Sequence, residues 1–106
     1  MLPKLVRDKI PELINTEGRS YRAYIATPEK YRFYLQLKMA EEVGELYETP
    51  TLNEAADVYE VFLTMLDVFN LKLDDVIDTA DKKREIKGAF HQGVILDEIV
   101  KIKEIK

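Results

Sequence analysis

A proline divides the acidic stretch that runs from residue 41 to residue 57, E-E-V-G-E-L-Y-E-T-P-T-L-N-E-A-A-D. Pro50 cannot donate a backbone hydrogen bond and disfavours helical geometry in the residue before it, so a helix that arrives from residue 48 must end here. Helical spacing of apolar residues resumes beyond it. The chain is therefore expected to fold back as two antiparallel helices joined by Thr49-Pro50-Thr51.

Each side of this turn carries an acidic pair at i, i+3 spacing, Glu42 with Glu45 and Glu54 with Asp57. Residues three apart are neighbours on a helix surface, so each pair lies on one face. Helices packed across the turn would bring four carboxylates together, which is costly unless cations neutralise them. Hard divalent cations prefer such oxygen ligands. The pattern predicts a Mg²⁺ site, with Mn²⁺ as a substitute.

The first of these helices is expected from Pro28 to Glu48, with Thr27 as its N-cap. At about 100° per residue, its apolar residues share an arc about 120° wide. They are Tyr31, Leu35, Met39, Val43 and Leu46. Glu42 falls inside this arc, Glu45 on its edge and Glu41 further round. A solvated acidic face would keep Glu42 off the apolar stripe, whereas a carboxylate among core positions must be protonated, paired or metal-bound.

The second helix is expected from Leu52 to Phe69, with Thr51 or Asn53 as its cap. Apolar residues cover most of its circumference. They are Ala55, Val58, Val61, Phe62, Met65, Leu66, Val68 and Phe69. A helix this apolar is expected to be buried on two sides, one against its own domain and one in a homo-oligomer.

The acids of the second helix fall into two classes by angle. Glu54 lies within the apolar arc and Asp57 beside it, whereas Glu60 and Asp67 point to the opposite side as surface acids do. The pair selected by its spacing is therefore also the inward pair.

A third helix is expected from Leu73 to Lys87. Its acids gather in the first turns and its bases in the last, which complements the helix dipole and could by itself explain the basic cluster. Lys83 and Lys87 also share a face at i, i+4 spacing, with Arg84 as an additional candidate. Basic groups near a carboxylate-held metal are what a polyphosphate requires, so these three residues are candidate phosphate ligands.

The remaining segments complete a mainly α prediction. A short helix is expected near the N-terminus, with Pro11 in its first turn. The residues of Ser20–Ala26 and Val94–Ile105 favour strands that would pair as a small β element. The expected fold is thus an antiparallel helical bundle with a possible two-stranded addition.

Composition excludes several classes of protein. A chain of 106 residues with 46% hydrophobic and 34% charged residues predicts one soluble globular domain, residues 1–106. The absence of cysteine excludes thiol chemistry, and one histidine argues against a His-rich zinc site. A net charge of −4 argues against duplex nucleic-acid binding. With neither a membrane span nor a signal-peptide core in view, the cytoplasm is the expected location.

These residues suit hydrolysis of a nucleoside triphosphate to the monophosphate and pyrophosphate. A divalent metal would bind the phosphate oxygens, a water would be activated, and cationic side chains would orient the phosphates. Glu41 is a candidate outer ligand or water-orienting base, with Glu42 and Glu45 as competing assignments. No pair of residues suggests a covalent nucleophile, so attack by water is preferred.

Three motifs resemble one family. E-E-V-G-E at Glu41–Glu45, followed by E-A-A-D at Glu54–Asp57, resembles the paired acidic motifs of the MazG-like, all-α NTP pyrophosphatase superfamily. K-L-V-R-D-K-I-P-E-L-I at Lys4–Ile14 is similar to the N-terminal signature of its phosphoribosyl-ATP pyrophosphohydrolase-like members. K-K-R-E-I-K-G-A-F at Lys82–Phe90 is similar to their K-x-x-x-R-G-G-F stretch, although lysine and alanine replace the arginine and the second glycine.

The resemblance implies an all-α fold, Mg²⁺ dependence, a homodimer or homotetramer, and release of pyrophosphate from a nucleotide. Clearance of non-standard nucleotides is one role that it suggests. By motif position it implies phosphate contacts from Lys83 and Lys87 and metal ligands at Glu42, Glu45, Glu54 and Asp57. The alternative is a non-catalytic helical dimer that binds a nucleotide or a protein. For the charged residues of the N-terminal signature, either an ion-pair network or a substrate-binding arm fits. They are Lys4, Arg7, Asp8 and Lys9.

Overall fold

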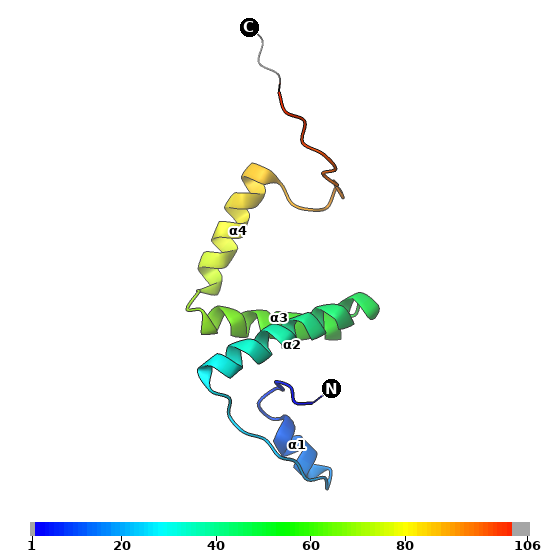
Figure 1. Ribbon diagram of the computed structural model, residues 1–106, viewed down its shortest axis with the longest axis vertical. Coiled ribbons are helices and arrows are strands. Elements are labelled where there is room, and N and C mark those ends of the chain that lie inside the picture. Colours follow the sequence, from blue (N-terminus) through cyan, green and yellow to red (C-terminus); the bar gives the residue numbers. More distant parts are fainter. Residues whose placement is uncertain (1, 103–106) are drawn as a thin grey trace. The chain divides into compact units, whose positions relative to one another are not determined.

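The computed structural model describes residues 2–102, which form four helices and no strand. The helices are α1 (Ile10–Thr16), α2 (Pro28–Glu48), α3 (Leu52–Val68) and α4 (Leu73–Lys87) (Figure 1). The mainly α prediction is confirmed. The chain divides into two units, residues 1–73 and 74–106. The single-domain organisation stays a prediction.

Threonine hydroxyls cap both central helices. The backbone N–H of Lys30 donates to Oγ1 of Thr27 at 3.4 Å, and that of Glu54 donates to Oγ1 of Thr51 at 3.2 Å. Each hydroxyl satisfies an N–H that has no partner inside its helix. Pro28 occupies the first turn of α2, where its missing N–H is harmless. The predicted caps are confirmed, with Thr51 rather than Asn53 at α3.

The end of α3 is fixed by a left-handed residue. Asn70 has φ 56°, a conformation that asparagine tolerates better than most residues. The N–H of Leu71 donates to the carbonyl of Leu66 at 2.8 Å, and the N–H of Asn70 donates to that of Asp67 at 3.2 Å. This pair of bonds is a Schellman motif, so α3 ends one residue earlier than predicted.

Helices α2 and α3 pack against each other in opposite directions across the turn at residues 49–51 (Figure 1). Leu35 of α2 and Val61 and Leu66 of α3 are the buried apolar side chains. At the far end of the pair, the guanidinium carbon of Arg32 lies 5.7 Å from the ring centre of Phe69, within cation–π range. The predicted helical hairpin is thereby confirmed within the first unit.

The small β element is not confirmed. Residues 20–26 and 94–102 are irregular in the structure, and residues 103–105 of the second predicted strand lie outside the described residues. The aromatic and β-branched residues of both segments favour strand locally. A strand is stable only when a neighbour accepts and donates its backbone hydrogen bonds, and within residues 2–102 neither segment has such a neighbour.

Large apolar side chains remain exposed in the first unit. Leu13, Phe33, Tyr59 and Phe69 all have half or more of their surface open to solvent. None of the helices within residues 2–102 has the length and apolar character that a membrane crossing requires.

Candidate metal centre

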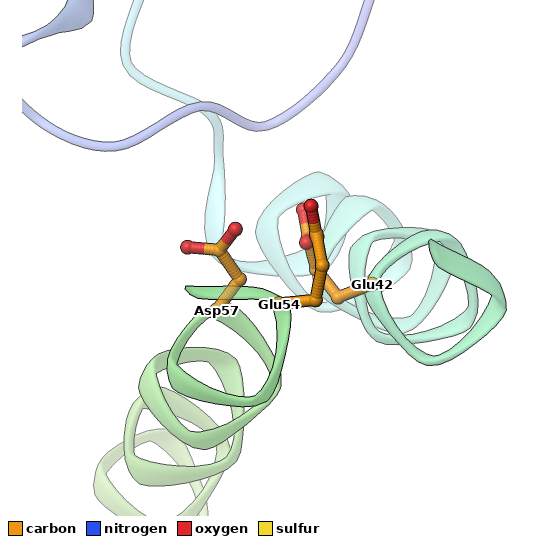
Figure 2. A group of neighbouring side chains, drawn as sticks. All are labelled: Glu42, Glu54 and Asp57. Atoms are coloured by element: carbon orange, nitrogen blue, oxygen red, sulfur yellow. The ribbon is translucent and has the colours of Figure 1, made fainter. Parts of the chain in front are cut away.

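Three of the four predicted ligands meet beside the α2–α3 turn. One carboxylate oxygen from each of Glu42, Glu54 and Asp57 lies within 4.8 Å of the other two. Glu42 projects from α2, and Glu54 and Asp57 project from α3 (Figure 2). Because the two helices fold back at residues 49–51, the inward acids of both meet at this end of the hairpin. We call these three residues the carboxylate cluster.

Two oxygens of the carboxylate cluster are buried without a partner. Only 5% of Glu42 is exposed, and its Oε2 atom has no hydrogen-bond partner within the described residues. The Oε2 atom of Glu54 is in the same state. Leaving a buried carboxylate oxygen unsatisfied is costly, and a bound cation would remove that cost.

The residue types and spacing fit a hard divalent cation. All three groups offer carboxylate oxygens, the ligand class that Mg²⁺ and Mn²⁺ prefer. With Mg–O distances of about 2.1 Å, oxygens on opposite sides of a bound Mg²⁺ are about 4.2 Å apart. The upper limit of 4.8 Å on the separations within the carboxylate cluster is therefore close to the span of such a coordination shell.

Lys38, a residue of α2, supplies one positive charge beside the carboxylate cluster. Its Nζ atom lies 3.2 Å from Oε1 of Glu42 and 3.0 Å from Oε1 of Glu41, and its side chain is 15% exposed. Burial tends to lower the pKa of Lys38, but hydrogen bonds to Glu41 and Glu42 outweigh it and raise the pKa above 10.5. Lys38 is therefore charged at neutral pH.

Glu41 stands beside the carboxylate cluster rather than in it. The hydrogen bond from Lys38 lowers the pKa of Glu41, against a smaller opposing effect of burial, and the charge of Lys4 at 3.7 Å lowers it further. Glu41 is ionised at neutral pH and can accept a proton from water, although the lowered pKa makes it a weaker base than an ordinary glutamate. Its assignment as that base stays a prediction.

Arg7 supplies a second counter-charge, which the sequence did not locate. Its Nη2 atom donates to Oδ1 of Asp57 at 2.7 Å, across fifty positions of sequence. That hydrogen bond raises the pKa of Arg7, burial opposes it as the second-largest effect, and the charges of Asp57, Glu60 and Glu42 add to the rise. Arg7 is visible in the sequence as a charged residue of the N-terminal signature. No spacing rule relates residue 7 to residue 57, so its pairing with Asp57 could not be predicted.

The remaining predicted site residues are not members of the carboxylate cluster. Glu45 is exposed and outside the carboxylate cluster. Lys83, Arg84 and Lys87 are exposed on α4, in the second unit, and their role as phosphate ligands stays a prediction. Arg84 pairs with Asp81 at 2.9 Å, while Lys83 and Lys87 have no carboxylate partner within residues 2–102.

A hollow of about 350 Å³ lies between the N-terminal segment and α2. Tyr34 and Leu37 line it from the helix, and Leu2 and Leu5 line it from the segment. Lys38 and Glu41 also line it, so this apolar hollow adjoins the charged groups described above.

No protein family, curated protein sequence or solved structure matches this chain.

Proposed function

We propose that this chain is a Mg²⁺-dependent nucleotide pyrophosphohydrolase whose metal is held by Glu42, Glu54 and Asp57. The observation that carries the proposal is the pair of buried, unpartnered oxygens in a group of three carboxylates. Such an arrangement is costly in the absence of a cation and is relieved by one. The proposal also rests on the likeness of both acidic motifs to those of MazG-like enzymes.

A divalent cation in this place would reduce the negative charge of the phosphate chain and lower the pKa of water. The chain's own groups account for the rest of the reaction. Water adds to a phosphorus of the triphosphate, the bridging P–O bond between the α- and β-phosphoryl groups breaks, and monophosphate and pyrophosphate are released. Glu41 accepts the proton from water, and Lys38 holds the Glu41 carboxylate in place through its contact at 3.0 Å. Lys83, Arg84 and Lys87 are proposed to bind the phosphates.

The finer features of the fold are proposed with the function. The proposed fold is an antiparallel MazG-like bundle. The proposed assembly is a homodimer or homotetramer, and the proposed location is the cytoplasm. The support is the exposed apolar surface of the first unit, including Phe33, Tyr59 and Phe69, which a second copy would cover. Light scattering coupled to gel filtration tests the assembly, and a monomer at micromolar concentration contradicts it.

The test is pyrophosphate release from a panel of standard and modified nucleoside triphosphates with Mg²⁺ or Mn²⁺. Glu42→Gln and Asp57→Asn keep the side-chain shape but remove a charge, and each is expected to lower turnover at least about 100-fold. The matched controls are Glu48→Gln on α2 and Asp67→Asn on α3, both exposed. Full activity in either cluster variant would show that the site is wrongly assigned.

A non-catalytic binding dimer is the second candidate, and one observation favours it. Lys38 and Arg7 already pair with Glu42 and Asp57, so much of the charge is compensated without a metal. A purely structural ion-pair network would show the same contacts. Binding of a nucleotide or protein with no pyrophosphate release from any member of the panel favours this reading over the enzyme.

A further inference from the structure

The side chain of Arg7 is the accessible counter-ion beside the carboxylate cluster. The backbone around it is held, because Leu5 and Val6 are half-buried and the N–H of Ile10 donates to the carbonyl of Arg7 at 3.0 Å. The guanidinium end is not held in the same way. The whole side chain is 53% exposed, and Asp57 is its one hydrogen-bond partner within the described residues.

Lys38 differs from Arg7 in each respect. It is largely buried, and it binds Glu41 and Glu42 at the same time. Moving Lys38 would leave Glu42 without its cation and Glu41 with only the more distant Lys4 at 3.7 Å, whereas moving Arg7 would free Asp57 alone. Of the two cations that the described part of the chain places against the cluster, Arg7 is therefore the one that can leave.

A divalent cation and Arg7 would compete for Asp57. The guanidinium already donates to Oδ1 of Asp57, and that residue is one of the three in the carboxylate cluster. A divalent cation beside the same carboxylate would repel the guanidinium, because like charges a few ångströms apart interact strongly at a partly buried site. Arg7 released in this way remains close to the site, since its backbone is anchored.

A freed guanidinium suits one class of ligand in particular. Its planar set of donors binds phosphate oxygens in pairs and stays charged at every physiological pH. The phosphate chain of a nucleotide that coordinates the metal would arrive at the place that Arg7 leaves. Asp57 would then lose one partner and gain the cation, and Arg7 would exchange a carboxylate for a phosphate.

We propose that Arg7 is an exchangeable counter-ion that occupies Asp57 until a divalent cation binds and then binds the phosphate chain of the nucleotide. This inference rests on the proposed function, and it gives Arg7 two opposite effects. Arg7 opposes binding of the metal alone, and it favours binding of the triphosphate once the metal is present. A residue with a purely structural role would change both affinities in the same direction or neither.

The experiment measures both affinities on the full chain. Free Mn²⁺ is followed by electron paramagnetic resonance during titration, and a non-hydrolysable triphosphate analogue is then titrated at saturating Mn²⁺. Arg7→Gln is expected to lower the Kd for Mn²⁺ roughly fivefold. The same variant is expected to raise the Kd for the analogue roughly tenfold. Arg19→Gln is the matched control, an exposed arginine paired with Glu17 away from the carboxylate cluster, and it should change neither.

Unchanged affinities in Arg7→Gln, or weaker Mn²⁺ binding, would overturn the inference. Far-UV circular dichroism checks the fold, and Arg7→Lys provides a second route should the glutamine variant fail to fold. Lysine keeps the charge but loses the paired donors, so near-normal Mn²⁺ affinity with weaker analogue binding supports the exchange, and normal binding of both overturns it. If the wild-type chain binds Mn²⁺ and releases pyrophosphate, and Arg7→Gln has the same two affinities as wild type, the inference is refuted and the proposed function stands. A wild-type chain that does neither refutes the proposed function as well.

Discussion

The Nζ atom of Lys38 lies 3.2 Å from Oε1 of Glu42, one turn further along the same helix. This ion pair satisfies one oxygen of a carboxylate that is almost fully buried, and the other oxygen, Oε2, has no partner among residues 2–102. Lys38 therefore reduces the cost of burying Glu42 without removing it. The Oε2 atom of Glu42 can therefore accept a second positive group, such as a divalent cation.

Addition of Mg²⁺ should stabilise the wild-type chain but not Glu42→Gln. A ligand at 100 times its Kd adds about 2.7 kcal/mol to the free energy of unfolding. For a chain of this size that corresponds to a rise in Tm of roughly 10 °C. Glu42→Gln should lose most of the shift and Glu48→Gln should keep it, as measured by thermal denaturation with EDTA or with Mg²⁺. Equal shifts in wild type and Glu42→Gln would show that Glu42 is not a ligand.

Leu66→Ala should destabilise the first unit because Leu66 is 7% exposed in the α2–α3 core. Loss of a buried leucine costs about 2–5 kcal/mol of unfolding free energy, from lost burial and from the cavity left behind. Leu52→Ala is the control on the same helix, since Leu52 is 90% exposed and should cost less than about 1 kcal/mol. Urea denaturation followed by circular dichroism measures both. A similar cost at the two positions would contradict the packing described.

Stability of the metal-free protein should fall at acid pH partly through Glu41. The pKa of Glu41 in the folded chain lies below its usual value of 4.5, chiefly because Lys38 donates to it. Its stabilising contribution is therefore complete above pH 4.5 and is lost as the pH falls through the lowered folded value. Urea midpoints in EDTA from pH 6 to pH 3 should fall less steeply for Glu41→Gln than for wild type or Glu48→Gln. Parallel curves for all three would refute this linkage.

Thr51→Ala should weaken the start of α3, because the Thr51 hydroxyl accepts the hydrogen bond from the Glu54 N–H. Loss of such a cap costs about 0.5–2 kcal/mol of unfolding free energy. Thr51→Ser retains the hydroxyl and should recover most of that stability in the same urea assay. If serine is no better than alanine, the hydroxyl is not responsible.

Local signals in the sequence located the helices well. Thr27 with Pro28 marks the start of α2, and Pro50 with Thr51 marks its end and the start of α3, because caps and proline act within one turn. The angular position of Glu42 correctly predicted its burial. Glu45, on the edge of the same arc, is exposed, since position on a helix defines a face but not how far the neighbouring helix covers it.

Two features depended on contacts between distant residues. The pairing of Arg7 with Asp57 is set by the docking of the N-terminal segment, which no local pattern encodes. The strand tendency of residues 20–26 is real but local, and strand formation requires a partner that this segment lacks within residues 2–102. Spacing therefore predicted the carboxylates of the site, whereas one of their counter-charges became visible only in three dimensions.

The short turn at residues 49–51 also has a consequence for the order of folding. Contacts between helices that are adjacent in sequence close quickly, because little loop entropy is lost, so the α2–α3 hairpin and its three carboxylates can assemble early. Lys38 is on the same helix as Glu42 and can neutralise it from the outset. Asp57 gains Arg7 only after the N-terminal segment docks, fifty positions away. In a newly formed hairpin, Asp57 would thus lack a counter-ion, and the arrival of the N-terminal segment would supply one.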